Sequence, residues 1–417
     1  MKQYEEYKDT GIGWIPKLPY VWETKKISSL FYERKTKVSD KDYAPLSVSK
    51  SGITPQLETA VKTDNGDNRK LVAAGDFVVN SRSDRKGSCG ISPLTGSVSL
   101  INIVLQPRKE INSNYFHYLS RSYNYIEEYY RLGRGIVADL WTTRYSELKN
   151  IYIPYPPLAE QEKIVSFLES KTLSIDTYVE EKERELQLLN ELKESEIANV
   201  ITRGLNPDVK MKDSGVSWIG MVPEHWHTYR FAALCKGKSI REQSGEELLS
   251  VYLDRGVIRF SDDDGRRTNP TSKDLSKYQL VEYGDFVLNN QQAWRGSVGV
   301  SKYRGIVSPA YFIFSLSPKL DSDFSNYMFR SRIYVAYYDI CSKGIGSIQR
   351  NLDWNLLRQK YIFLPSIEEQ RAIVAYIEKK CAQVNTLISE LEAEIEYLKE
   401  YKQKLIADCV TGQINVQ

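Results

Sequence analysis

The chain has 417 residues, of which 41% are hydrophobic and 27% charged, and its formal net charge is +3. These proportions are typical of globular proteins, so they exclude a disordered tail protein, a collagen-like fibre and a disulfide scaffold. The length corresponds to two or three ordinary domains, which excludes a single small binding module as the whole molecule.

No uncharged apolar run of about 18 residues is present, and the first residues, Met1 to Glu6, lack the apolar stretch of a signal peptide. We therefore expect a cytoplasmic location and no membrane contact. The five cysteines form no C-x-x-C pair, which favours buried small side chains over a disulfide framework or a zinc site. They are Cys89, Cys235, Cys341, Cys381 and Cys409.

The sequence contains two copies of one long unit. Residues 75–80 (GDFVVN) recur as residues 284–289 (GDFVLN), a shift of 209 positions that continues without a gap towards the C-terminus. Residues 9–15 match residues 213–219 at a shift of 204. A repeat of roughly 200 residues is far longer than a solenoid repeat, so we expect each copy to have its own core.

Each copy begins with a globular part and ends with a helical part. Short Val-, Ile-, Tyr- and Phe-rich runs separated by turn residues predict strands, and one helical segment is expected in each copy. The predicted strand runs are 70–80, 98–105, 279–288 and 310–316, and the helical segments are 114–130 and 323–339. The expected domains are lobe 1 (1–157), a spacer helix (158–206), lobe 2 (207–365) and a second spacer helix (366–417).

Apolar residues in both spacer segments alternate steps of three and four, which is the pattern of a coiled-coil seam. Thr172 and Lys182 interrupt the stripe in the first segment. The predicted packing residues are Val165, Leu168, Ile175, Val179, Leu186 and Leu189 in the first segment, and Val374, Ile377, Val384, Ile388, Leu391, Ile395 and Leu398 in the second.

A single helix with such a stripe would leave it in water, so we expect the two helices to pack against each other in the antiparallel sense. The predicted fold class is α+β. It consists of two duplicated, mixed but mostly β domains separated by two long antiparallel coiled-coil helices, with pseudo-two-fold symmetry.

Charge is distributed unevenly along the chain. Residues 158–203 contain 11 acidic and 6 basic residues, and residues 366–411 contain 9 acidic and 6 basic residues. The two helices thus carry −5 and −3, which leaves +11 for the remainder of a chain whose total is +3. Basic lobes on an acidic spacer suit a protein that contacts DNA phosphates at two places.

Catalytic chemistry is not indicated. No Ser/His/Asp or Cys/His set repeats between the copies, and no G-x-G-x-x-G loop is present. His225 and His227 could supply two metal ligands, but no further ligand lies at zinc-type spacing. We predict no catalytic residue and no metal site in this chain.

Taken in order, the duplicated motifs resemble those of the specificity (S) subunit of a type I restriction-modification enzyme. Each copy opens with D-x-G-x-x-W-I-x-x-x-P (9–19 and 213–223) and contains the G-D-F-V-x-N block. Each then enters its long helix through a proline followed closely by E-Q-x-x-I-V. The resemblance covers essentially the whole chain, and it depends on the order and duplication of the motifs.

The resemblance implies a non-catalytic subunit whose two target-recognition domains each read one half of an interrupted double-stranded DNA sequence. The helices are implied to set the number of unread base pairs and to dock two modification (M) subunits, which methylate adenine N6 with S-adenosylmethionine. Restriction (R) subunits that use ATP and Mg are implied as further partners. No cofactor is implied for this chain itself.

Base readout requires Arg, Lys, Asn, Gln or Ser on loops that reach a groove. The loops after residues 80 and 289 match at their flanks and differ at 81–85 and 290–294, as expected if one scaffold reads two half-sites. The lobe 1 candidates are Asn80, Arg82, Ser83, Arg85, Lys86 and Ser88, with Ser47, Ser49, Lys50 and Arg69 as secondary positions. The lobe 2 candidates are Asn289, Asn290, Gln291, Gln292, Trp294, Arg295 and Ser297, with Arg255, Arg259, Arg266 and Arg267 as secondary positions.

We expect Arg85→Ala or Arg295→Ala to weaken specific DNA binding by about 1 to 3 kcal/mol.

Two other functional classes of protein remain open from the sequence. One is a stand-alone DNA-binding or adaptor protein whose coiled coil mediates self-association, which co-purification with a methyltransferase subunit would distinguish. The other is a fused adenine methyltransferase, which S-adenosylmethionine binding by the chain alone would favour.

Overall fold

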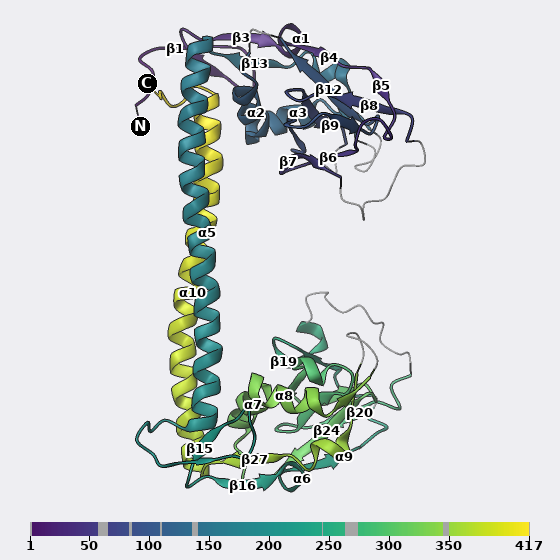
Figure 1. Cartoon of the computed structure of the whole chain (residues 1–417), viewed down its shortest axis with the longest axis vertical. Coiled ribbons are helices and arrows are strands. Elements are labelled where there is room, and N and C mark those ends of the chain that lie inside the picture. Colours follow the sequence, from purple (N-terminus) through teal and green to yellow (C-terminus); the bar gives the residue numbers. More distant parts are fainter. Residues whose placement is uncertain are drawn as a thin grey trace. The chain divides into compact units, whose positions relative to one another are not determined.

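The computed structural model describes residues 2–56, 66–82, 86–108, 111–135, 141–243, 245–262, 274–344 and 350–416. The chain divides into two compact units. Unit 1 comprises Met1–Glu183 and Glu392–Gln417, and unit 2 comprises Arg184–Leu391. Each unit therefore contains one lobe together with part of each long helix (Figure 1).

Lobe 1 is built around a four-stranded antiparallel sheet in the order β10-β9-β12-β4. These strands are Cys89–Ile91, Phe77–Asn80, Asn102–Pro107 and Phe31–Glu33. The remaining strands are β1 (Tyr7–Asp9), β2 (Lys17–Pro19), β3 (Glu23–Lys26), β5 (Lys37–Val38), β6 (Leu46–Ser49), β7 (Gly52–Pro55), β8 (Arg69–Val72), β11 (Gly96–Val98) and β13 (Tyr152–Tyr155). The helices are α1 (Ile27–Leu30), α2 (Ser113–Arg121), α3 (Tyr123–Arg131) and α4 (Tyr145–Leu148).

Lobe 2 repeats this sheet in the corresponding order β22-β21-β24-β17. These strands are Val298–Val300, Phe286–Asn289, Tyr311–Leu316 and Cys235–Lys238. The others are β14 (Met211–Asp213), β15 (Met221–Pro223), β16 (His227–Arg230), β18 (Leu249–Tyr252), β19 (Gly256–Arg259), β20 (Gln279–Val281), β23 (Gly305–Val307), β25 (Ser342–Lys343), β26 (Asn351–Leu352) and β27 (Tyr361–Leu364). The helices are α6 (Phe231–Leu234), α7 (Ser322–Arg330), α8 (Arg332–Ile340), α9 (Trp354–Leu357) and the 3-10 turns η3 (Phe260–Asp262) and η4 (Ala293–Arg295).

The core of each lobe lies between the sheet and the helix that follows it. In lobe 1, the α2 ring of Phe116 lies 4.5 Å from that of Phe31 and 4.7 Å from that of Phe77, between ring centroids. In lobe 2, the α7 ring of Phe329 lies 4.4 Å from that of Phe286. All five side chains are buried, so the duplicated Phe of the G-D-F block is a core residue in both copies.

One sequence expectation was wrong in detail. Residues 114–130 and 323–339 were each predicted as one helical segment, but each contains two helices, because Ser122 and Ser331 are extended with ψ of 142° and 147°. The Ser122 hydroxyl donates to the carbonyl of Leu119 at 2.7 Å, and the Ser331 hydroxyl donates to that of Met328 at 2.8 Å. A serine that bonds the preceding turn in this way competes with continuation of the helix.

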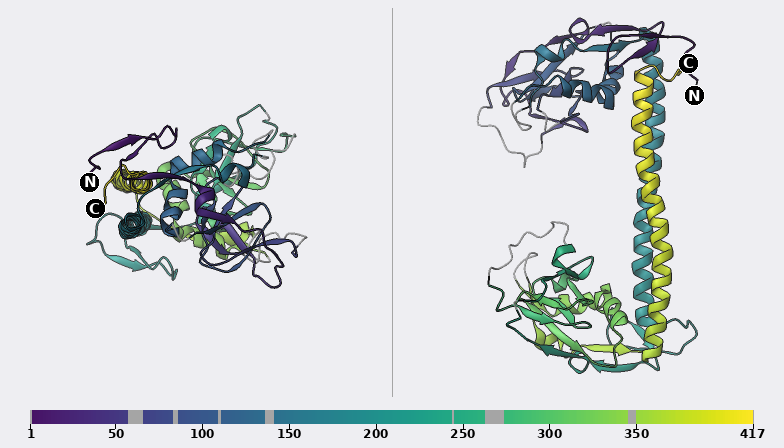
Figure 2. Two further views of the ribbon diagram at one scale, coloured as in Figure 1. Left: turned by 90° about the horizontal axis from the view of Figure 1, so that it is seen from above. Right: turned by 180° about the vertical axis from the view of Figure 1, so that it is seen from behind.

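The long helices α5 (Leu158–Arg203) and α10 (Ile367–Val410) contain 46 and 44 residues. They lie side by side within each unit (Figures 1 and 2). In unit 1, Lys402 binds Asp176 and Lys399 binds Glu183. Since residue numbers fall along α10 as they rise along α5, the helices are antiparallel, and the predicted α+β class with two long antiparallel helices is confirmed.

The thirteen predicted packing residues of α5 and α10 are all buried or half-buried. Leu168 and Ile377 are 0% and 2% exposed, whereas Leu173 and Leu188, on other faces of α5, are 68% and 55% exposed. Across the described ranges, no helix has the length and apolar character needed to cross a bilayer.

Candidate nucleic-acid interface

The aspartate of the duplicated G-D-F block holds the strand that leads to each candidate loop. Asp76 is buried, accepts a hydrogen bond from the Ala73 amide at 2.9 Å, and binds Arg34 with its two oxygens at 2.6 and 3.1 Å. These hydrogen bonds from Arg34 to Asp76 raise the pKa of the guanidinium above its usual value. The aspartate therefore stabilises the turn before β9 and is not available to DNA.

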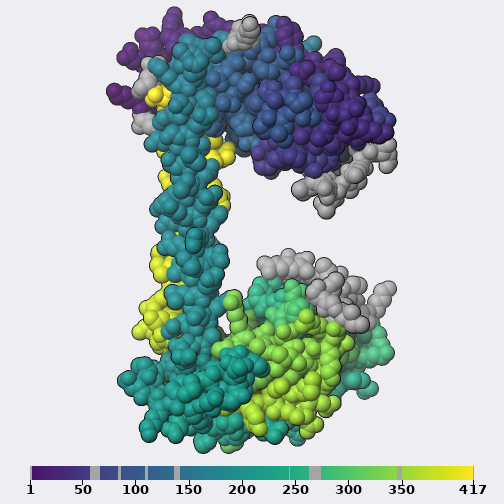
Figure 3. All heavy atoms as spheres, in the orientation of Figure 1, coloured from purple at the N-terminus to yellow at the C-terminus, as the bar shows by residue number. Residues whose placement is uncertain are grey.

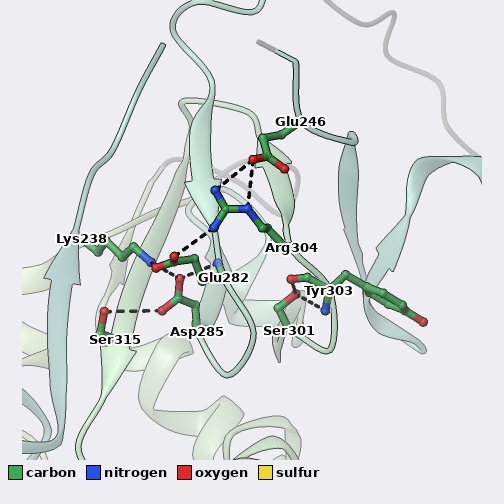
Figure 4. A network of polar contacts seen from close by, with 8 residues as sticks. All are labelled: Lys238, Glu246, Glu282, Asp285, Ser301, Tyr303, Arg304 and Ser315. Carbon is green, nitrogen blue, oxygen red and sulfur yellow. Dashed lines mark hydrogen bonds and ion pairs between the residues drawn. The ribbon is translucent and has the colours of Figure 1, made fainter. Parts of the chain in front are cut away.

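Lobe 2 uses the same device within a larger network (Figure 4). Asp285 accepts from the Glu282 amide at 2.8 Å and from Lys238 Nζ at 2.6 Å. Glu282 also binds Lys238, and Arg304 connects Glu282 to Glu246 at 3.1 and 2.9 Å. Position 238 corresponds to position 34 at the shift of 204, so a cation pairs with the G-D-F aspartate in both copies.

The loop after β9 begins with an asparagine that caps its own turn. Asn80 Oδ1 accepts a hydrogen bond from the Arg82 amide at 3.1 Å, and the Arg82 side chain is exposed. Further along, Lys86 Nζ lies 2.5 Å from Glu127 Oε1 and 4.5 Å from the centroid of the Tyr130 ring. The predicted residues Ser83 and Arg85 lie outside the described residues.

The loop after β21 begins in the same way. Asn289 Oδ1 accepts from the Gln291 amide at 3.1 Å, and Asn290 Oδ1 accepts from the Leu352 amide at 2.9 Å. Trp294 Nε1 donates to the Gln291 carbonyl at 3.1 Å. Gln291 and Arg295 are exposed, and Gln292 is half-buried.

Five of the eight secondary candidates lie in the hairpins β6–β7 and β18–β19. Lys50 is exposed at the first turn, where the Ser49 and Ser51 hydroxyls lie 2.7 Å apart, and Ser47 is half-buried on β6. In lobe 2, the guanidinium of Arg255 lies 4.7 Å from the Tyr252 ring. Arg259 lies 4.9 Å from the Tyr303 ring and 3.4 Å from Glu247. Arg266 and Arg267 fall in a segment that is not described.

A duplicated arginine that sequence reasoning did not select holds both hairpin turns. Arg121 donates to the Lys50 carbonyl at 2.6 Å, and Arg330 donates to the Asp254 carbonyl at 2.5 Å. Burial lowers the pKa of Arg330, and the charge of Asp254 opposes this effect. The sequence signal that could have identified this arginine is the recurrence of Arg-Ser at residues 121–122 and 330–331, at the shift of 209.

In unit 1, Arg121 also joins two of the predicted candidates in one cavity of about 380 Å³. The cavity brings Lys50 and Lys86, which come from different segments, next to Arg121. Its other lining residues are Gly87, Tyr123, Ile126, Glu127 and Gln403. Three cations around one carboxylate form a positive recess that suits an anionic group such as a phosphate.

Three predicted residues face the interior instead. Arg69 is 5% exposed and donates from Nε to the Ser97 hydroxyl at 2.8 Å and from Nη2 to the Ser97 carbonyl at 3.0 Å. Ser88 and Ser297 are 4% and 3% exposed, and the Ser297 hydroxyl donates to the Val251 carbonyl at 2.9 Å. Because a buried side chain offers no donor to a DNA groove, we leave these three out of the proposed surface.

Comparison with known proteins gives one family. Residues 19–188 match the family model described as the type I restriction modification DNA specificity domain. The putative type I restriction enzyme MjaX specificity subunit of Methanocaldococcus jannaschii is 24% identical over 99% of this chain and 97% of its own length. The MjaVIII specificity subunit of the same organism is 27% identical over 64% of this chain, and the match spans 63% of that relative, which is less than two thirds. The EcoKI specificity subunit of Escherichia coli is 20% identical over 97% of this chain and 90% of its own length.

Solved structures share the fold. A chain from a structure of the type I R-M system, concerned with its complex assembly and conformational transition, matches 95% of this chain and 99% of its own length with a TM-score of 0.66 and 16% identity. The HsdS subunit of Thermoanaerobacter tengcongensis matches 95% of this chain and 98% of its own length with a TM-score of 0.50 and 18% identity. The resemblance of this chain to the specificity subunits of type I restriction-modification enzymes is therefore confirmed, and residues 19–188 are the part that matches their DNA specificity domain.

Proposed function

We propose that this chain is the DNA sequence-recognition subunit of a type I restriction-modification system, and that each lobe reads one half of an interrupted duplex sequence. One observation carries the proposal. The two lobes have the same strand order, and in each a cation binds the G-D-F aspartate, Arg34 to Asp76 and Lys238 to Asp285. On this shared scaffold, loops of different composition follow β9 and β21. A shared scaffold with different exposed loops is what recognition of two different half-sites requires.

Charge supports DNA as the ligand. The residues outside the two long helices carry a net +11, and exposed or half-exposed cations lie on the candidate loops, including Lys50, Lys86 and Arg295. Neutralising phosphates supplies most non-specific affinity, while the differing Asn, Gln and Arg side chains supply discrimination.

The long helices are proposed to dock two M subunits, with R subunits joining the assembly. In each unit α5 presents one long side to solvent (Figure 3). In unit 2, Leu188 and Leu192 of α5 and Leu387 of α10 are 55%, 57% and 48% exposed, and Leu192 and Leu387 line an apolar cavity of about 300 Å³. Exposed apolar side chains on a paired helix favour a protein partner.

In this proposal the chemistry belongs to the partners. S-adenosylmethionine would bind the M subunit and ATP with Mg the R subunit, while this chain would contribute only recognition and assembly. A cytoplasmic location is part of the same proposal.

The test is methylome sequencing of cells that express this chain with its M subunit. We expect a two-part adenine-methylation sequence, interrupted by unread positions, that is absent from cells lacking this chain. Arg295→Ala should reduce methylation at that sequence, since a lost base contact costs about 1 to 3 kcal/mol. An identical methylome with and without the chain would contradict the proposal.

A further inference from the structure

One pair of contacting residues beside the candidate loop is aromatic in lobe 1 and ionic in lobe 2. At the shift of 209, Tyr130 and Trp141 of lobe 1 correspond to Asp339 and Arg350 of lobe 2. The Tyr130 and Trp141 rings stack with centroids 5.9 Å apart, and Trp141 Nε1 donates to the Tyr130 carbonyl at 3.0 Å. In lobe 2 an ion pair replaces this stack, with Arg350 Nη1 2.6 Å from Asp339 Oδ1. One member of each pair lies in the last turn of α3 or α8.

The candidate loop lies beside this pair in both lobes. In lobe 2 the Arg350 guanidinium lies 4.6 Å from the centroid of the Trp294 ring. In lobe 1 the loop residue Lys86 lies over Tyr130 and pairs with Glu127. The position equivalent to Glu127 in lobe 2 is Ala336, so lobe 2 lacks this carboxylate beside its loop.

Arg350 is held from two sides. Asp339 accepts a hydrogen bond from one terminal nitrogen, and the guanidinium carbon lies over the Trp294 ring. The Arg350 side chain is nevertheless 33% exposed. A guanidinium has five N–H donors, so an arginine that is fixed by one carboxylate and one ring keeps donors for a ligand and loses little freedom on binding.

We infer that Arg350 is a specificity-determining residue of lobe 2, and that it reads a guanine in the half-site of that lobe. Guanine offers the O6 and N7 acceptors side by side in the major groove, which matches the fork of an arginine. Among the described residues of lobe 1, the equivalent position 141 is a tryptophan and the cation beside the pair is the ammonium of Lys86, so no guanidinium replaces Arg350 there. This inference rests on the proposed function, because it assigns one base contact to one lobe.

The test selects bound sequences from a random duplex DNA library with the full chain in complex with its M subunit. We compare the unmodified chain with Arg350→Ala, Arg350→Lys and Asp339→Asn. Arg350→Ala should lower the preference for guanine at one position of one half-site by about tenfold and leave the other half-site unchanged. Arg350→Lys should show the same loss, because an ammonium keeps the charge but cannot make the paired contact.

Asp339→Asn should lower the guanine preference at the same base position by a smaller factor. This variant retains Arg350 but weakens the hydrogen bond that orients its guanidinium. Arg358→Ala is the matched control, because Arg358 is an exposed arginine of the same lobe outside this cluster, and it should leave the selected sequence unchanged. Hydrogen exchange of α8 should be native-like in each variant. If Arg350→Ala fails to fold, the Lys and Asn variants decide the question.

A contact with phosphate alone would give a uniform loss of affinity for all sequences, rescued by Arg350→Lys, and would overturn the inference. Unchanged guanine preference in the Arg350 variants would overturn it as well. If the unmodified complex selects no two-part sequence, the proposed function itself fails, so the two failures are distinguishable.

Discussion

Lobe 1 and lobe 2 share the buried polar contacts that join each lobe to its long helix and differ in the side chains around the candidate loops. Gln161 and Gln370, both 0% exposed, make the same bonds at the start of α5 and α10. Gln161 accepts from the Asn112 amide at 2.9 Å and donates to the Pro156 carbonyl at 2.9 Å. Gln370 accepts from the Asp321 amide at 2.8 Å and donates to the Pro365 carbonyl at 3.0 Å.

The positions in and beside the candidate loops differ between the lobes, because Tyr130–Trp141 becomes Asp339–Arg350 and Lys86–Glu127 becomes Arg295 with Ala336. The comparison of two copies within one chain thus separates side chains that hold the scaffold from those that face a ligand. Buried polar groups recur because losing one partner leaves the other unsatisfied, whereas exposed positions are free to diverge.

The largest effect is expected where a shared buried contact is removed. Asp76→Ala should destabilise lobe 1 by about 3 to 5 kcal/mol, because it leaves the Arg34 guanidinium without its buried carboxylate. Asp285→Ala should cost lobe 2 less, since Lys238 keeps Glu282 as a partner. Hydrogen exchange of β9 and β21 measures the destabilisation of each lobe. Equal decreases in stability would show that the larger network of lobe 2 does not compensate for the loss of Asp285.

The helix pair should depend most on positions where it packs into a lobe. Leu168 is 0% exposed and belongs to the lobe 1 core, whereas Leu189 is only half-buried. We expect Leu168→Ala to cost about 3 to 4 kcal/mol and Leu189→Ala about 1 kcal/mol. Thermal unfolding of the two variants tests this ranking, and the reverse order would contradict it.

Acidification should affect lobe 1 at a position where lobe 2 does not titrate. His117 Nδ1 accepts from the Ile91 amide at 3.3 Å, and the equivalent Asn326 Oδ1 accepts from the Val300 amide at 3.1 Å. Burial, assisted by the charge of Arg121, lowers the pKa of His117 from 6.5 to about 4. Between pH 6.5 and about 4, His117 is therefore protonated in the unfolded chain but neutral in the folded lobe. The free energy of unfolding of lobe 1 consequently falls as the pH drops through this range.

This loss should reach about 2 to 3 kcal/mol, after a discount for the partial exposure of the ring. His117→Asn copies the lobe 2 residue and should remove the loss. The measurement is hydrogen exchange of β10 and β22 at pH 7 and pH 4.5. Equal acid sensitivity of the His117→Asn variant and the unmodified chain would contradict the assignment.

The smallest effect is expected for an exposed ion pair. Lys402 Nζ lies 2.6 Å from both oxygens of Asp176, whose side chain is 51% exposed. Lys402→Ala should cost less than about 1 kcal/mol, and 1 M salt should reduce the difference further. Denaturant unfolding at low and high salt checks this, and a large salt-independent loss would mean that the contact is effectively buried.

Repetition and periodicity were sufficient to predict the duplication, the α+β class and the antiparallel pairing of the helices. The apolar stripe from Val374 to Leu398 required a partner, and α5 supplies it. The break at Ser122 could not be predicted, since serine is also tolerated inside helices and its side-chain bond to the Leu119 carbonyl is visible only in the structure.

The site was predicted less completely than the fold. Arg69 has the composition of a DNA contact but is buried against Ser97, and Arg121 supports the Lys50 turn from a helix far away in sequence. Arg350 gave no sequence signal, because its role depends on tertiary contact with Trp294 and Asp339.

The most direct measurement of the central claim uses one variant in each lobe. Lys86→Ala and Arg295→Ala occupy equivalent positions, and each is compared with the unmodified complex by selection from a random duplex library. If each lobe reads its own half-site, Lys86→Ala alters or weakens preference in one half only, and Arg295→Ala does so in the other half only. Changes by both variants in the same half, or in neither, would contradict the assignment of one half-site to each lobe.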